Sequence, residues 1–541
     1  MLTGAVPWPA EFAARYRREG YWRDETLAQL LRGPAGSAGA RTAVVSGGGR
    51  TSYAELDSRA DQIAAGLRQL GVVAGDRFVV QLPNTVDLLA VCVALFRAGA
   101  IPVLALPAHR RAEIGYLCEH ADAAGLVIPG VHLGFDHRAM AREIRGALPG
   151  LRHVLVAGEP GEFTALTDVL APPAEMPPPD PADVALCLLS GGTTGLPKLI
   201  PRTHHDYVCQ LRGTAREMGL DDSGAYLAVL PVAHNAALGC PGVLGALRAG
   251  AKVVLAASPA PDEAFPLIAA EAVTLTTLMP AFLPLWATTA GLFEVDLSRL
   301  VIEVGGARLD PEVASSAEQA LGCTITRWFG MAEGLLTFTR TGEPARVRHA
   351  TEGRPLWPAD EIRVVDAGER DAPPGSVGEL LVRGPSVVRG YYRAQGYNAT
   401  AFTPSGFLRT GDLVRVTPEG NMVVAGRLRD VVNRGGEKVP TAEVEDHIRA
   451  HPGVKDVAVT AVPDPVLGEC SCAFVIPAGD PPSLRDLRDF LTGRGLAAFK
   501  LPDQMELVGS FPNTPVGKVD KAALRDITRW SAGGGEPSRL Q

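Results

Sequence analysis

The first half of the chain alternates between helix-type and strand-type patterns of apolar residues. Ser52 and Glu55 have the spacing of a capping box, and the apolar residues after them recur three or four positions apart: Leu56, Ala60, Ile63, Ala64, Leu67 and Leu70. Gly71 ends this predicted helix, and residues 77–82 predict a strand. A second predicted helix, 87–98, leads into the fully apolar run 100–106, which is typical of a buried parallel strand. This alternation predicts an α/β fold with crossover helices.

Proline and glycine mark two changes in this organisation. The proline-rich stretch 171–183 has no regular pattern, and we interpret it as a linker between two α/β lobes. Beyond about residue 350, short strand-like segments separated by glycines predict a small antiparallel β unit. Further helix and strand patterns beyond residue 440 predict a smaller α+β domain. We therefore expect an N-terminal core of residues 1–428 and a C-terminal domain of residues 429–541.

Composition narrows the class of protein. With 541 residues the chain is too long for a single compact core, and 46% hydrophobic and 21% charged residues are ordinary for globular domains. The net charge of −8 argues against nucleic-acid and membrane-surface partners, which need a basic face. No run of about 18 apolar residues and no signal peptide are visible. Eight cysteines without metal-type spacing fit reduced thiols, so we expect a cytoplasmic protein.

One local motif points to phosphate binding. An apolar strand-like run ends in a glycine- and hydroxyl-rich loop that is followed by a lysine: Ser190, Gly191, Gly192, Thr193, Thr194, Gly195 and Lys198. Glycines let backbone N–H groups face an anion, hydroxyls add donors and the lysine adds charge. The loop lacks the Gly-Lys-Ser/Thr ending of a P-loop. Alone, such a loop is often a surface turn, but the flanking strand and lysine favour a polyphosphate cradle.

Four other features are ambiguous when each is taken alone. Glu333 lies in an otherwise apolar or small segment, where a carboxylate either caps a helix or holds a cation. Asp412 follows a strand and could bind a ribose diol, although a turn is the simpler interpretation. Lys518 lies on a Pro/Gly loop, and taken alone it is interpreted as a solvated surface charge. The glycine-bearing segment 304–308 does not indicate a particular chemistry when it is taken alone.

Taken together and in this order, the motifs resemble the adenylate-forming superfamily of acyl and aryl acid ligases. The resemblance extends from about residue 22 to residue 530. It is strongest to the stand-alone enzymes that activate 2,3-dihydroxybenzoate and salicylate in siderophore pathways. The stretches that carry it are SGGTTGLPKLIPRTH, PVAHN, FGMAEGL, RGYY, NRGGEKV and FPNTPVGKV.

The resemblance implies ATP and Mg²⁺ as cofactors and assigns roles to the motifs. The loop from Ser190 to Lys198 would hold the β- and γ-phosphates, Glu333 would coordinate Mg²⁺, and Asp412 would bind the ribose with support from Arg427. Residues that would line the nucleotide pocket are Gly306, Ala307, Arg308, Phe329, Gly330, Met331 and Ala332. Lys518 would bridge the incoming carboxylate and the phosphate, and Arg429 would be the hinge about which the C-terminal domain swings.

The resemblance also outlines an acid pocket. Its residues would be His234, which also counts as catalytic, with Asn235, Ala236, Cys240, Gly306, Trp328, Leu335 and Leu336. Amino-acid-activating relatives carry Asp at the position of Asn235, and a neutral amide cannot balance an α-ammonium group, so an aryl acid is expected. Cys240 and Leu336 make the pocket less polar or tighter than in dihydroxybenzoate enzymes, whereas Ala236 opens space and Trp328 fills it. Salicylate, 2,3-dihydroxybenzoate and 3-hydroxyanthranilate types all remain open.

The sequence therefore predicts an aryl-acid–AMP ligase that loads the phosphopantetheine thiol of an aryl carrier protein acting in trans. An aryl-CoA ligase would share the first half-reaction and differ only in its acceptor. A catalytically dead binding module on the same fold is the third hypothesis, and the intact set of Ser190, Lys198, Glu333, Asp412 and Lys518 argues against it.

Overall fold

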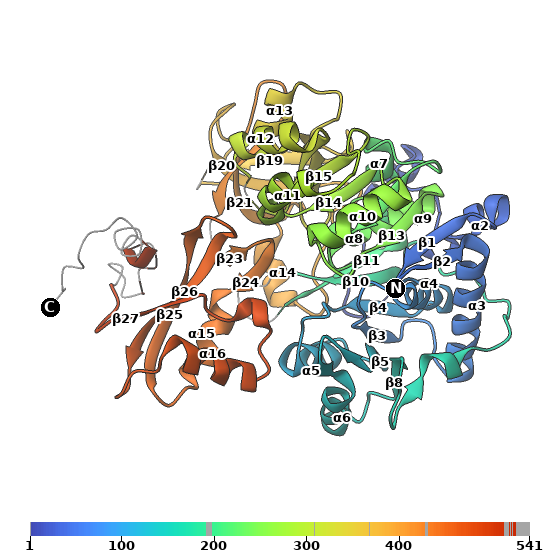
Figure 1. The fold of residues 1–541 in the computed structure, drawn as a ribbon, viewed down its shortest axis with the longest axis horizontal. Coiled ribbons are helices and arrows are strands. Elements are labelled where there is room, and N and C mark those ends of the chain that lie inside the picture. The colour runs from blue at the N-terminus through green and yellow to red at the C-terminus, as the bar shows by residue number, and fades with distance from the viewer. Residues whose placement is uncertain are drawn as a thin grey trace. The chain divides into compact units, whose positions relative to one another are not determined.

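The computed structural model describes residues 2–190, 197–307, 309–366, 368–427, 431–512, 519, 521 and 523–525 (Figure 1). These residues form two compact units. The first unit contains the described residues up to Gly426, except Ala108–Glu113 and Pro197. The second unit contains these exceptions and the described residues from Arg427 onward. The predicted boundary at 428/429 stays a prediction, because residues 428–430 lie outside the described part of the chain.

Two large sheets form the frame of the first unit. The nine-stranded sheet has the order β18 (Arg354–Pro355), β17 (Leu336–Phe338), β16 (Thr324–Gly330), β15 (Val301–Gly305), β14 (Leu275–Leu278), β12 (Ala225–Ala228), β13 (Lys252–Leu255), β1 (Thr42–Ser46) and β2 (Gly49–Ser52). Its five strands β12 to β16 run parallel to one another, whereas β17 is antiparallel to β16. The seven-stranded sheet has the order β11 (Leu199–Thr203), β10 (Val184–Leu189), β4 (Ile101–Leu104), β3 (Arg77–Val80), β5 (Gly125–Pro129), β8 (His153–Ala157) and β9 (Thr164–Ala165).

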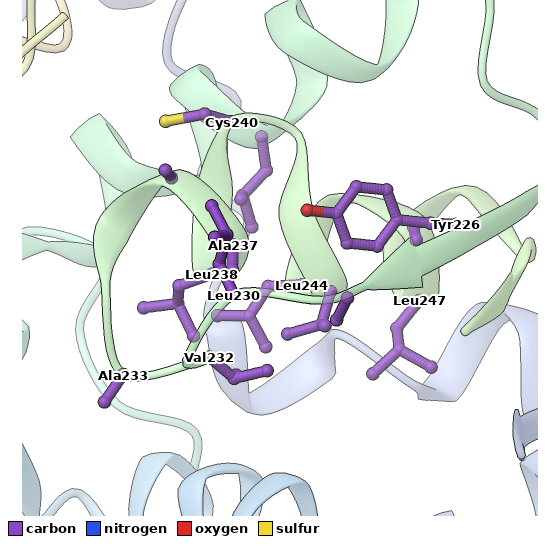
Figure 2. Packing of buried hydrophobic residues seen from close by; sticks show 14 of the residues in the cluster. Tyr226, Leu230, Val232, Ala233, Ala237, Leu238, Cys240, Leu244 and Leu247 are labelled. Carbon is purple, nitrogen blue, oxygen red and sulfur yellow. The ribbon is translucent and has the colours of Figure 1, made fainter. Parts of the chain in front are cut away.

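Helices pack between and around these sheets. Helix α3 (Tyr53–Gln69) begins with the predicted capping box: the Glu55 amide donates to Ser52 Oγ (3.2 Å), and the Ser52 amide donates to Glu55 Oε2 (2.7 Å). It contacts β1 and β2 and packs on α4 (Val86–Ala98), which contacts β4 of the other sheet. Likewise α7 (His204–Glu217) contacts both β11 and α9 (Gly242–Ala249), and α9 lies against β12 and β13. The apolar side chains of these helices bury the core, as Figure 2 shows for the cluster between β12 and α9.

The remaining helices of the first unit are α1 (Ala10–Arg18), α2 (Arg32–Ala38), α6 (His137–Ala147), α8 (Asn235–Gly239), α10 (Pro261–Glu271), α11 (Leu283–Thr289), α12 (Pro311–Leu321), α13 (Ala345–Ala350) and α14 (Gln395–Ala401). Helix α5 (Arg111–His120) has its first residues in the other unit. Single 3₁₀ turns are η1 (Leu27–Gln29), η2 (Leu166–Val169), η3 (Pro280–Phe282) and η4 (Ala290–Leu292), and β6 (Val131–His132) pairs with β7 (Phe135–Asp136).

The predicted small β unit is present within the first unit. It is a four-stranded sheet of β19 (Glu361–Val365), β20 (Gly378–Arg383), β21 (Leu408–Val416) and β22 (Met422–Arg427), in which β19, β20 and β21 are antiparallel. Its strands coincide with the glycine-punctuated segments of the sequence. The prediction is confirmed. Glycine and proline at the ends of those segments favour turns, so the ends of the strands are visible in the sequence.

The second unit is the predicted α+β domain. Its sheet has the order β24 (Glu437–Pro440), β23 (Val431–Arg434), β26 (Gly468–Pro477) and β25 (Val454–Asp464), with β27 (Gln504–Leu507) also paired to β26. Helices α15 (Thr441–Arg449) and α16 (Leu484–Gly493) and the turn η5 (Ala498–Lys500) accompany it. Its core includes Val432, Val444, Ile448 and Leu487, whose side chains are all 0% exposed. Cys470 and Cys472 are buried thiols in β26, as packing predicts.

The interpretation of residues 171–183 as a linker between two lobes is wrong. The stretch does lack helix and strand, but β10 and β11, which follow it, belong to the same sheet as β3, β4, β5, β8 and β9, which precede it. Conversely, β1 and β2 near the N-terminus complete the later sheet. Apolar patterns identify strands but do not say which strands pair over long distances, so a proline-rich connection was mistaken for a boundary.

Candidate active site

The ends of the predicted phosphate loop are held together by an antiparallel strand pair. β10 and β11 pair up to Leu189 and Leu199, and the Ser190 amide donates to the Lys198 carbonyl (2.9 Å) while the Lys198 amide donates to Ser190 Oγ (3.0 Å). The Lys198 ammonium lies 3.9 Å from the ring centroid of Tyr397, a cation–π distance. Gly191, Gly192, Thr193, Thr194 and Gly195 lie outside the described residues.

Glu333 lies in a tight turn that follows β16. The Gly334 amide donates to the Met331 carbonyl (3.0 Å), and Gly334 has φ +125°, where a Cβ would lie 1.7 Å from the Ser386 carbonyl oxygen, so only glycine fits. Tyr391 donates its hydroxyl to Glu333 Oε1 (2.8 Å), which fixes the carboxylate. Burial, and after it the Glu333 charge, raises the pKa of Tyr391 well above its usual range, so the phenol stays a donor.

Two tyrosines connect the lysine and the carboxylate. The rings of Tyr391 and Tyr397 pack edge to face with centroids 5.2 Å apart, so Lys198, Tyr397, Tyr391 and Glu333 form a continuous series of contacts. The structure therefore brings together two motifs that are 135 residues apart in sequence. Neither tyrosine is among the predicted site residues. RGYY is one of the motifs that carry the resemblance, but nothing in the sequence shows which side chain its rings contact.

The candidate acid pocket is built at the start of α8. His234 caps this helix, with Nδ1 accepting from the Ala236 amide (3.3 Å), and stays partly exposed. Asn235 is buried: its Oδ1 accepts from the Tyr207 hydroxyl (2.8 Å), and its Nδ2 donates to Cys240 Sγ (3.5 Å). Ala236 and Cys240 are also buried, and burial raises the pKa of the Cys240 thiol, which therefore stays neutral.

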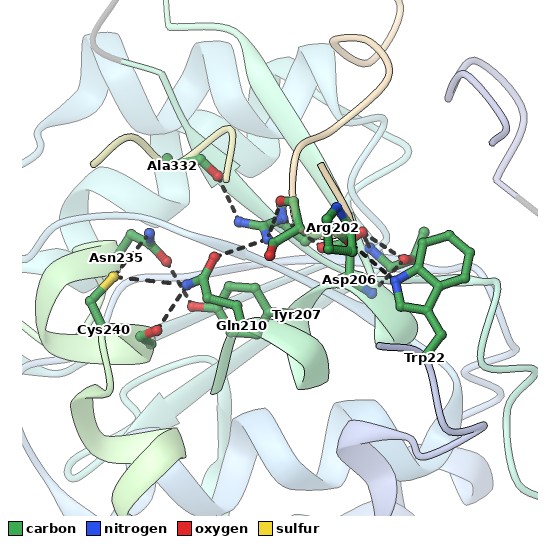
Figure 3. Close-up of polar contacts among 12 residues, drawn as sticks. Trp22, Arg202, Asp206, Tyr207, Gln210, Asn235, Cys240 and Ala332 are labelled. Carbon is green, nitrogen blue, oxygen red and sulfur yellow. Dashed lines mark hydrogen bonds and ion pairs between the residues drawn. The ribbon is translucent and has the colours of Figure 1, made fainter. Parts of the chain in front are cut away.

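A buried arginine connects this pocket to the Glu333 turn (Figure 3). Arg202 has a fully buried side chain and donates Nε to Asp206 Oδ1 (2.7 Å), Nη1 to the Ala332 carbonyl (2.8 Å), and Nη2 to Gln210 Oε1 (3.0 Å) and the Ser386 carbonyl (2.9 Å). Gln210 in turn donates to the Gly239 carbonyl (2.8 Å) and approaches Cys240 Sγ (3.8 Å). The sequence does not predict Arg202, Tyr207 or Gln210 as site residues. Their contacts with the acid pocket and the Glu333 turn depend on the position of α7 and of the end of β11 in the fold.

The glycines and aromatic residues of the predicted nucleotide pocket lie at the carboxyl ends of β15 and β16. In an open parallel sheet this edge is where ligands bind. Gly305 is the last residue of β15, and Trp328 and Phe329 come just before Gly330, the last residue of β16. Gly306 has φ +82°, where a Cβ would lie 2.9 Å from Met279 Sδ. Partly exposed residues of the predicted site at this edge are Gly306, Ala307, Phe329, Gly330, Met331 and Ala332; Trp328, Leu335 and Leu336 are buried.

The other predicted residues are only partly placed. Asp412 is buried on β21, and its amide donates to Thr410 Oγ1 (3.0 Å). Arg427 ends β22, the neighbouring strand, and its side chain is not described. Arg308, Arg429 and Lys518 lie outside the described residues, so their roles stay predictions.

Comparison with known families decides the classification. The model of the AMP-binding enzyme family matches residues 32–392, two thirds of the chain, and that of the AMP-binding enzyme C-terminal domain matches residues 443–518. The chain belongs to the AMP-binding enzyme family. This confirms the adenylate-forming resemblance and its two-part α/β architecture.

Individual relatives span nearly the whole of this AMP-binding enzyme. A 2,3-dihydroxybenzoate-AMP ligase of Bacillus subtilis is 51% identical over 527 residues, covering 97% of this chain and 98% of that protein. A salicyl-AMP ligase / salicyl-S-ArCP synthetase of Mycobacterium tuberculosis is 46% identical, covering 97% and 94%. The solved structure of apo MbtA from Mycobacterium smegmatis matches with TM-score 0.75 and 45% identity, covering 97% and 98%.

In the described part of the chain, every helix is too short or too polar to cross a membrane.

Proposed function

We propose that this AMP-binding enzyme activates an aryl carboxylic acid with ATP and transfers the acyl group to the phosphopantetheine thiol of a carrier protein. In the first half-reaction a carboxylate oxygen attacks the α-phosphorus, the bond to the β-phosphate oxygen breaks, and aryl-AMP and pyrophosphate form. In the second, the thiol attacks the acyl carbonyl, AMP leaves, and the thiol proton passes to solvent or base. Full-length similarity to a 2,3-dihydroxybenzoate-AMP ligase and a salicyl-AMP ligase carries this proposal.

The acid pocket supports an aryl acid over an α-amino acid. Asn235 is neutral, its amide oxygen is already used by Tyr207, and its Nδ2 is a donor. A donor cannot balance an ammonium group, but it can hydrogen-bond to an ortho hydroxyl or to a carboxylate. His234, partly exposed at the same turn, would orient the acid from the other side. Tyr207, Asn235 and Cys240, which hold this turn, carry no charge, which suits an uncharged ring.

Adenylation needs charge stabilisation and alignment more than acid–base chemistry. Ser190 and Lys198 would place donors and positive charge against the phosphates. Glu333 suits Mg²⁺, because a carboxylate oriented by Tyr391 is a ligand type that this ion prefers. Bound Mg²⁺ would neutralise phosphate charge. Lys518 would meet the carboxylate and phosphate where negative charge collects, Asp412 and Arg427 would hold the ribose, and Arg429 would serve as the hinge.

ATP–pyrophosphate exchange tests the first half-reaction. The panel contains salicylate, 2,3-dihydroxybenzoate, 3-hydroxyanthranilate, benzoate, picolinate and several α-amino acids. We expect strong exchange with at least one ortho-substituted aromatic acid and none with the amino acids. Exchange with amino acids would overturn the argument from Asn235, and silence with every acid despite ATP binding would favour a dead binding module.

The acceptor is tested separately with the preferred acid. Phosphopantetheinylated aryl carrier protein and free coenzyme A are offered at equal thiol concentration, and thioester formation is measured by mass spectrometry. We expect the carrier protein to be acylated at least about 10-fold faster at subsaturating concentration. Faster acylation of coenzyme A would instead assign an aryl-CoA ligase.

A further inference from the structure

A row of polar side chains crosses the centre of the nine-stranded sheet. The Tyr226 hydroxyl on β12 donates to Thr277 Oγ1 on β14 (3.1 Å), and Thr277 donates to Glu303 Oε2 on β15 (3.0 Å). Thr277 is in register with Glu303, and Glu303 with Thr326 on β16, so these side chains project from the same face of the sheet. All four are buried, at 0% exposure for Tyr226, Glu303 and Thr326 and 1% for Thr277.

Three polar atoms at one end of this row have no hydrogen-bond partner among the described residues: Glu303 Oε1, Thr326 Oγ1 and Trp328 Nε1. A buried polar group left without a partner is costly, so three neighbouring examples call for a ligand. Burial raises the pKa of Glu303 well above its usual range, opposed only by the hydrogen bond from Thr277. Burial therefore favours the neutral carboxyl, which can both donate and accept a hydrogen bond.

This polar cluster lies next to the candidate acid pocket. Glu303 and Gly305 are two positions apart on β15 and share a face, about 7 Å apart along the strand. Gly305 offers no side chain, and the Trp328 indole lies against it, 2.5 Å from where a Cβ would stand. Glu303 is also one of the groups that raise the pKa of the Cys240 thiol, after burial itself, so the two side chains are within electrostatic range. Figure 2 shows Tyr226 and Cys240 in the same buried cluster.

We propose that Glu303, Thr326 and Trp328 form a polar subsite that binds a second hydrogen-bonding group on the ring of the acid substrate. The proposal rests on the aryl-acid activation proposed above and narrows its substrate class. The ring carries a hydroxyl, an amino group or a ring nitrogen away from the carboxylate. Such a group accepts from the indole N–H or the acid O–H, and a hydroxyl or amino group also donates to a carboxyl or threonine oxygen.

The alternative is that the cluster is only a structural element of the core. A structural role predicts that changing Glu303 alters stability and lowers the exchange rate equally for all acids. A ligand role predicts that the change acts on one member of a pair of acids that differ by a single polar group. The ratio of kcat/KM within such a pair therefore separates the two.

The experiment measures ATP–pyrophosphate exchange for wild type, Glu303→Leu, Glu303→Gln and Thr326→Val. Matched pairs are salicylate with its 3-, 4- and 5-hydroxy and amino derivatives, and benzoate with the pyridine carboxylic acids. For at least one pair, wild type should favour the polar member about 10-fold or more in kcat/KM. Glu303→Leu should reduce this ratio to about 3 or less, and Thr326→Val should lower the same ratio. Glu303→Gln, which keeps a donor and an acceptor, should retain more of it than Glu303→Leu.

Thermal unfolding of each variant shows whether it is folded, and the two conservative variants carry the test if Glu303→Leu does not fold. An equal loss for both members of every pair would overturn the subsite, as would a wild-type ratio near one for all pairs. Absence of exchange with every acid in wild type would refute the aryl-acid function itself, which is a different result from an unchanged ratio.

Discussion

Replacing Arg202 with methionine probes the network that ties the acid pocket to the Glu333 turn. Methionine keeps most of the side-chain length and removes the charge and every donor. The Asp206 carboxylate, 1% exposed, would keep only its two hydrogen bonds from Thr203, at 2.7 Å from the amide and 2.6 Å from the hydroxyl. Removing one partner of a buried ion pair costs about 3–5 kcal/mol. The acceptors on Gln210, Ala332 and Ser386 also lose their donor, which places the expected loss in the upper part of that range.

Urea unfolding measures this loss as a change in the free energy of unfolding. Arg145→Met is the matched control, because Arg145 is an exposed arginine on α6 without an ion pair in the described part of the chain, and its loss should stay within about 0.5 kcal/mol. Burial raises the pKa of Asp206 and Arg202 opposes that rise, so in the variant the pKa rises further.

The folded variant therefore binds a proton that the unfolded chain releases, and its stability should fall as pH rises. The loss relative to wild type should be larger at pH 8 than at pH 5. A loss below about 1 kcal/mol, or a loss that does not change with pH, would refute the argument that Arg202 compensates a buried carboxylate.

Three further predictions concern other parts of the enzyme. Burial raises the pKa of Asp360 to about 7, so the folded state retains a proton that the unfolded chain loses near pH 4. The contribution of Asp360 to stability should fall by about 3 kcal/mol between pH 4 and pH 7, and urea unfolding across that interval should show that Asp360→Asn lacks this fall. Tyr391→Phe should raise the Mg²⁺ concentration for half-maximal exchange about 10-fold, because Glu333 loses its orienting hydrogen bond; an unchanged Mg²⁺ titration would contradict that role. Lys518→Ala should slow adenylation at least about 100-fold while transfer from supplied aryl-AMP changes little, and equal losses in both half-reactions would disprove the assignment.

Local patterns predicted the elements well because they depend on neighbours in sequence. The capping box at Ser52, the buried strand at Ile101–Leu104 and the small antiparallel sheet all follow from periodicity and turn residues. Local patterns did not predict which strands share a sheet, because β10 and β11 join strands that precede the proline-rich stretch. Pairing over such distances depends on the packing of whole helices and leaves no local signal.

The candidate site shows the same difference between features that depend on nearby residues and features that depend on long-range contacts. Motifs with a fixed chemical type, such as the loop before Lys198 and the segment around Glu333, stand out from residue type and spacing, and the roles given to them stay predictions. Tyr391, Gln210 and Arg202 were missed because their importance lies in what they contact, and those partners lie on other elements. Glu303 was missed for a similar reason: in sequence it is one acid in a strand, and only the register with Thr277 and Thr326 makes it part of a cluster.

The pairing of β1 with β13 in the later sheet has a consequence during synthesis. Val44 on β1 pairs with Val253 on β13, which the ribosome adds roughly 200 residues later. At about 5–20 residues per second, the hairpin of β1 and β2 emerges some 10–40 s before its partner exists. Through that interval its outer edge is an open strand with apolar residues at Ala43, Val44 and Val45, the kind of surface that invites aggregation and chaperone binding. The nascent chain, rather than the finished enzyme, is thus the state most exposed to misassembly, and slower translation through residues 53–252 lengthens that exposure.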